Sequence, residues 1–118
     1  MKFLFVFLGG GVGSMFRYAI WRAFDKFDHQ IPYATFIANA LSCLILGYLI
    51  GIQLKLDMSE NIRLLLLIGF CGGFSTFSTF GFETFQMLES GNIQTAIGYI
   101  LISLLVCWIF IYLGIKMS

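Results

Sequence analysis

An all-α membrane protein with four transmembrane helices, the third of them broken, is the fold class that the sequence predicts. The 118 residues are 59% hydrophobic and only 11% charged, whereas a soluble domain carries roughly 25% charged residues. The apolar residues form four runs, each close to the ~20 residues that a spanning helix needs. A pair of glycines weakens the third run. Because four spans use nearly the whole chain, we expect a single domain, residues 1–118, with no soluble part.

The four spans are expected at residues 3–24, 33–54, 62–88 and 94–115. The first begins after Lys2 like a signal peptide, but glycines interrupt its apolar region and no small-residue cleavage site follows, so we interpret it as a span. A polar connection ending at Pro32 precedes the second span, and its His29 is expected to be a solvated histidine. The second and fourth spans contain no charged residue.

Small residues recur at four-residue spacing within the first two spans, where they allow helix backbones to approach closely in lipid. The rows are Gly9 with Gly13, Gly10 with Ser14, Ala34 with Ala38 and Ser42, and Gly47 with Gly51. This pattern predicts a tightly packed bundle and says nothing about chemistry.

The basic residues are almost evenly divided between the two predicted membrane faces. With four spans, both termini and the second connection share one face, which holds four basic residues, and the other face holds two or three. They are Lys2, Lys55, Arg63 and Lys116 on the first face, and Arg22, Lys26 and, if it reaches the surface, Arg17 on the second. Because such residues set orientation, a chain this balanced can insert both ways, and two opposite copies would form an antiparallel homodimer.

Composition excludes several classes of function. A net charge of +1 leaves no basic field for nucleic acid. Three cysteines, all inside apolar runs, argue against disulfides and zinc and favour small buried side chains. With one histidine and no nucleophile–base, phosphate-loop or intramembrane acidic-pair pattern, the chain is not expected to be an enzyme.

Three polar residues within or near the spans are candidates for function. Asn39 needs hydrogen-bond partners in hydrocarbon, and it is either a helix–helix contact or, with two N–H donors, part of a path for an anion. Arg17 either snorkels to the interface or places a positive charge in a vestibule that attracts anions. Glu83 is either an interfacial carboxylate or the partner of an arginine.

The stretch GFCGGFSTFSTF, residues 69–80, combines phenylalanines at three-residue spacing with hydroxyls. On a helix Phe77 and Phe80 share one face, and so would the serines and threonines three apart. Gly72 and Gly73 weaken the helix upstream, and a break at this depth is tolerated only inside protein or beside water. The phenylalanines are either ordinary packing or a wall whose ring edges face an anion.

At these residues the chain resembles the CrcB/Fluc family of small fluoride channels, over essentially its whole length. The resemblance lies in GGGVGSMFRY in the first span, in Asn39 within TFIANALSCLILG, and above all in GFCGGFSTFSTF. It implies a dual-topology antiparallel homodimer in the cell inner membrane, in contact with lipid. Two pores would let fluoride leave the cytoplasm passively and so give fluoride resistance.

The resemblance also implies roles for particular residues. Phe77 and Phe80 match the phenylalanines that fluoride passes, Asn39 matches the pore asparagine, and Arg17 and Glu83 match charged positions beside the pathway. Hydroxyls along the same pathway are matched by Ser78, Thr79 and Ser103. A structural Na⁺ at the dimer centre would be held by main-chain carbonyls, and Gly72 and Ser75 match those positions.

Two positions depart from the family pattern. Ser75 stands where a threonine is usual, which a main-chain ligand does not require. Cys107 stands one turn after Ser103, where another hydroxyl is expected, and a thiol is a weaker donor.

Two alternatives belong to other classes of protein. A small multidrug-type, proton-coupled antiporter also has four helices, but it needs an acidic residue in the first span, where this chain has none. A membrane scaffold without transport activity would release no ion from liposomes.

Overall fold

The computed structural model describes residues 1–27 and 31–118, so His29 lies outside the described residues. It contains four helical spans long and apolar enough to cross a membrane, as predicted, and no strand within the described residues. The first span is α1 (Lys2–Phe24), the second is α2 (Tyr33–Lys55) and the fourth is α6 (Ile93–Met117). The third span, Glu60–Glu89, consists of several pieces.

The third span is broken, as predicted, but the break does not fall at the two glycines. Its pieces are α3 (Glu60–Arg63), a π-helical segment η1 (Leu64–Cys71), α4 (Gly72–Phe74) and α5 (Phe77–Glu89). The backbone is extended at Ser75 and Thr76, between α4 and α5. Gly73 serves close packing instead, since a Cβ there would lie 2.3 Å from the carbonyl oxygen of Gly10 on α1.

Small residues bring the helices together in two closely packed groups. One group is α2 with α6, and the other is α1 with the first half of the third span, η1 and α4. A Cβ at Gly13 would lie 2.2 Å from the carbonyl oxygen of Phe70, and one at Gly47 would lie 2.2 Å from that of Ile111. Real Cβ atoms do not approach so closely, so these positions require glycine. The predicted rows Gly9 with Gly13 and Gly47 with Gly51 therefore lie where neighbouring helices come into close contact.

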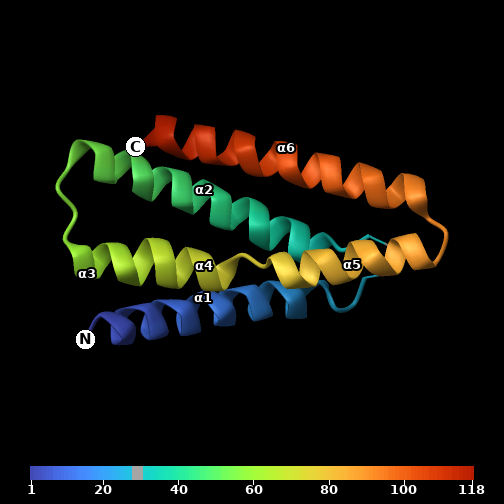
Figure 1. Ribbon diagram of the computed structural model, residues 1–118, viewed down its shortest axis with the longest axis horizontal. Coiled ribbons are helices and arrows are strands. Elements are labelled where there is room, and N and C mark those ends of the chain that lie inside the picture. Colours follow the sequence, from blue (N-terminus) through green and yellow to red (C-terminus); the bar gives the residue numbers. More distant parts are fainter. Residues whose placement is uncertain (28–30) are drawn as a thin grey trace.

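The two ends of the bundle carry different connections (Figure 1). Both termini and the link from α2 to α3 lie at one end, and the link from α5 to α6 lies at the other. At the first end Lys2 forms an ion pair with Glu60, with 2.7 Å between Nζ and Oε1, and the ammonium of Lys55 donates to the main-chain oxygen of Ser118. Two of the lysines on this face are therefore already paired.

Large apolar side chains cover the outside of the bundle, and its interior is small. The described part of the chain has no fully buried large side chain, which suits a protein whose solvent is lipid. One buried cluster, Met87, Ala96 and Tyr99, joins α5 to α6, and Phe80 packs against it. This cluster fixes the position of α5 after the break.

Candidate functional site

Asn39 braces the break in the third span from the neighbouring helix α2. Its Oδ1 accepts a hydrogen bond from the Thr76 amide N–H at 2.7 Å, and its Nδ2 donates to the Thr76 carbonyl oxygen at 3.1 Å. The two bonds fix the orientation of the side-chain amide, because only the oxygen can accept from an N–H. Asn39 is thus a helix–helix contact, and one of its two N–H groups still remains for another acceptor.

Thr76 caps the second half of the span. Its Oγ1 accepts from the Thr79 amide N–H at 3.3 Å, as an N-cap residue does. In a continuous helix the Thr76 amide would pair with the carbonyl of Gly72, and the Thr79 amide with that of Ser75. Both amides donate elsewhere, so the break releases two main-chain carbonyls from their helical partners.

A groove of about 200 Å³ runs along the break, and it brings together four of the residues predicted for the fluoride pathway: Asn39, Phe77, Phe80 and Ser103. The rest of its lining is Cys43, Ser75, Thr76, Leu104 and Cys107. No residue in this lining carries a charge. The Oγ of Ser103 is buried and has no hydrogen-bond partner among the described residues. Such a hydroxyl is costly unless a group in the groove accepts a hydrogen bond from it.

The two predicted phenylalanines are neighbours in different surroundings. The ring centroids of Phe77 and Phe80 are 5.9 Å apart, and Phe80 also lies 5.1 Å from the ring of Tyr99. The Phe77 side chain is 82% exposed. Phe74, before the break, is buried against α1 and η1, where its ring meets those of Phe16 and Phe70. The break therefore separates Phe74 from the other two.

A second hollow, of about 300 Å³, gathers polar groups on α1, α2 and the start of α5. Arg17 and Thr79 line it together with Ser14, Thr35 and Thr76. Arg17 makes no ion pair within residues 1–27 and 31–118, so its charge is not neutralised there by a protein carboxylate. Thr76 lines both this hollow and the groove, so the two spaces adjoin at the break.

Ser78 lines neither of these spaces. It is exposed, and its Oγ lies 3.4 Å from the Oγ1 of Thr76. The hydroxyls of the motif therefore differ in position, and of the two predicted ones only Thr79 lines a hollow.

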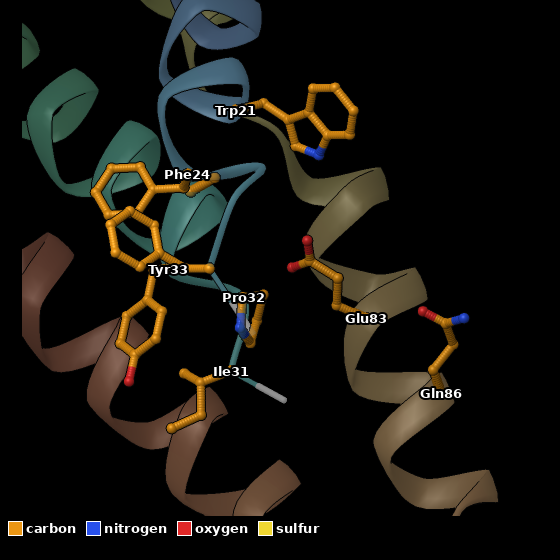
Figure 2. A pocket seen from close by; sticks show the side chains of 9 residues that line it. Trp21, Phe24, Ile31, Pro32, Tyr33, Glu83 and Gln86 are labelled. Atoms are coloured by element: carbon orange, nitrogen blue, oxygen red, sulfur yellow. The ribbon is translucent and has the colours of Figure 1, made fainter. Parts of the chain in front are cut away.

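Glu83 lines a third space, of about 200 Å³, together with residues near the end of α1 and the start of α2. Figure 2 shows its carboxylate directed from α5 into this pocket, on the side facing Trp21 and Pro32. Its Oε1 accepts from the Thr35 hydroxyl at 2.5 Å, and its Oε2 accepts from the Tyr99 hydroxyl at 3.1 Å. The partners of this carboxylate are hydroxyls of α2 and α6, and among the described residues no arginine pairs with it.

Sequence reasoning did not single out Thr35 and Tyr99, or the capping role of Thr76. A signal for the first two was present, since Thr35 precedes Asn39 by four residues and Tyr99 precedes Ser103 by four. Side chains at that spacing share a helix face. The cap of Thr76 had no local signal, because its helix begins only where the break ends.

Comparisons with known proteins identify the family to which the chain belongs. The family described as CrcB-like protein, Camphor Resistance (CrcB), matches residues 4–115. A protein of Chloroflexus aurantiacus is 44% identical over 118 residues, which covers 98% of this chain and 93% of its own. One of Phocaeicola vulgatus is 39% identical over 116 residues, covering 98% and 96%. One of Azobacteroides pseudotrichonymphae is 40% identical over 106 residues, covering 88% and 85%.

All three relatives carry the name fluoride-specific ion channel FluC. The match spans all four helices, and the chain covers most of the length of each relative. This chain is a multi-pass membrane protein, and it belongs to the CrcB-like family.

Proposed function

We propose that this chain is a fluoride-selective channel through which fluoride leaves the cytoplasm passively, and that it thereby gives fluoride resistance. The observation that carries the proposal is the uncharged groove along the break, where Asn39, Ser103, Phe77 and Phe80 meet. The name of the relatives, fluoride-specific ion channel FluC, supports the same function.

The groove offers fluoride replacements for its water. Asn39 has one N–H left after its bonds to Thr76, and the Ser103 hydroxyl has no partner among the described residues. The edges of Phe77 and Phe80 are weakly positive. None of these groups carries a full charge, so they hold an anion without trapping it, which conduction requires. Arg17, in the adjoining hollow, supplies a positive charge that attracts anions and repels cations.

The working unit is a homodimer of two copies inserted in opposite orientations. Phe77 is 82% exposed, and Ser78 and Thr79 beside it are exposed as well. Hydroxyls in the middle of a span are costly against lipid, so this face needs a protein cover. The nearly equal number of basic residues at the two ends allows both orientations. A second copy related by a two-fold axis in the membrane plane would cover the face and give two pores.

The proposed dimer also holds a structural Na⁺ at its centre. The carbonyls of Gly72 and Ser75 lose their helical partners, because the amides of Thr76 and Thr79 donate elsewhere. Released carbonyls at a helix break are the ligands that Na⁺ takes in membrane proteins. Gly72 is exposed, and a Cβ there would meet nothing within 4 Å. The residues present therefore fit the ion, which would link the two copies.

The location we propose is the cell inner membrane, with lipid around the dimer. The alternative function, proton-coupled antiport, would require an acidic residue in the first span to exchange a proton. Helix α1 (Lys2–Phe24) contains none.

The test is fluoride efflux from liposomes that contain the purified chain, read with a fluoride electrode and with chloride efflux as the control. Rapid fluoride release with little chloride release is the expected result. A folded dimer that releases no fluoride would refute the channel. Uptake of a lipophilic cation driven by a proton gradient would instead support the antiporter.

A further inference from the structure

Two cysteines face each other between the closely packed helices α2 and α6. These helices run side by side in the same direction (Figure 1), and their backbones are in close contact where Gly47 lies against Ile111. One turn earlier on each helix lie Cys43 and Cys107. The regular register of the pair thus places the two cysteines opposite each other, and both of them line one groove.

Cys43 and Cys107 both line the groove that Asn39 and Ser103 also line. Asn39 lies one turn before Cys43 on α2, and Ser103 lies one turn before Cys107 on α6. Both cysteines are free and partly exposed. The third cysteine, Cys71, is only 3% exposed and does not line the groove. The chain therefore offers a pair of thiols in the groove and an internal control outside it.

The number of ligands limits the metal that such a pair can hold. Zn²⁺ in a structural site takes four ligands, and no group of three or more Cys, His, Asp or Glu within residues 1–27 and 31–118 could hold a metal. Thiolates are soft ligands that select soft cations. A divalent soft cation bound by two thiolates is neutral overall, so it avoids the cost of burying a net charge.

We propose that Cys43 and Cys107 form a two-thiolate site for a soft divalent cation of the Hg²⁺ type. Each thiol releases one proton to water as its sulfur binds the metal, so the step consumes one cation, liberates two protons and changes no oxidation state. The metal would narrow the groove beside Phe80 and block the passage of ions. The blocking effect rests on the proposed channel function, whereas the binding does not.

Binding is tested with HgCl₂ as the probe, on purified chain in detergent and in the presence of excess monothiol, followed by desalting and measurement of mercury per chain. Wild type and Cys71→Ser are expected to retain one mercury per chain. Cys43→Ser and Cys107→Ser are each expected to lose at least about 100-fold in affinity, because removing a ligand costs more than disturbing its surroundings. Retention of mercury by either of these two variants, or its loss from Cys71→Ser, would overturn the site.

The blocking effect is tested in liposomes, where each variant is compared with its own rate before HgCl₂ is added. Fluoride efflux is expected to fall in wild type and in Cys71→Ser, and to stay at its starting rate in Cys43→Ser and Cys107→Ser. If mercury binds at the two cysteines but fluoride efflux does not slow, the blocking effect is refuted and the binding site still stands. Wild-type chain that releases no fluoride before treatment would refute the channel itself, while the binding measurement still decides whether the mercury site exists.

Discussion

Replacing Asn39 by aspartate tests whether the groove along the break carries an anion. The substitution keeps an oxygen that can accept from the Thr76 amide, which now lies 2.7 Å from Oδ1. It removes the donor to the Thr76 carbonyl, at the cost of one interhelical hydrogen bond, about 0.6 kcal/mol on average. The fold should therefore persist, while a negative charge replaces a donor in the groove.

The size of the groove sets the expected effect on fluoride. A volume of about 200 Å³ corresponds to a sphere about 7 Å across, so the carboxylate and an ion inside it would be about 4–7 Å apart. With an effective dielectric constant of about 20, they repel by about 2.4–4 kcal/mol. At 1.4 kcal/mol for each factor of ten, occupancy of the groove by fluoride falls by about 50- to 1,000-fold.

The assay is fluoride efflux from liposomes in alkaline buffer, which keeps the introduced carboxyl ionised, with size-exclusion chromatography to verify the dimer. Asn92→Asp is the matched control, since it makes the same chemical change in the exposed turn before α6, and it should leave efflux unchanged. A folded Asn39→Asp dimer that releases fluoride near the wild-type rate would show that the ion does not pass this residue.

Three further changes test other parts of the molecule. Phe80→Ile should slow fluoride efflux by about tenfold, because a ring contact is worth up to about 1.5 kcal/mol, whereas Phe82→Ile, outside the groove, should not. Gly47→Ala would place a Cβ 2.2 Å from a carbonyl oxygen of α6 and should lower the thermal unfolding midpoint in detergent, at a cost of about 1–3 kcal/mol. Gly98→Ala meets nothing within 4 Å and should leave the midpoint unchanged or raise it, so equal losses in both variants would contradict the packing argument. Replacing Na⁺ with N-methylglucamine should weaken the dimer on size-exclusion chromatography, and identical elution in both buffers over a dilution series would argue against the ion.

Much of the fold could be read from the chain because its causes are local. Whether a segment crosses a membrane depends on hydrophobicity summed over about 20 consecutive residues, and all four such segments are plain in the sequence. Rows such as Gly9 with Gly13 are also local patterns, and they mark the real close contacts. The motif at residues 69–80 indicated a break because glycines and hydroxyls interrupt an apolar run there.

The position of the break was decided by tertiary structure. Gly72 and Gly73 are adjacent glycines, and glycine has the weakest helix propensity of the residues in the third span. Both are nevertheless helical, and the backbone becomes extended at Ser75 and Thr76 instead. A main-chain amide leaves a helix in a low-dielectric setting only where another group accepts its hydrogen bond. That group is Asn39, on a different helix, which no local pattern could place.

By itself, then, the sequence determined that this protein is a bundle of four membrane helices, where its backbones pack and which polar residues lie at membrane depth. Only the tertiary structure decided which of those residues meet: Asn39 with Thr76, Glu83 with Thr35 and Tyr99, and two cysteines across one groove. The physical reason is the range of the forces. Hydrophobicity and helix propensity act on neighbours in the chain, whereas a buried hydrogen bond selects its partner from whichever helix lies within about 3 Å.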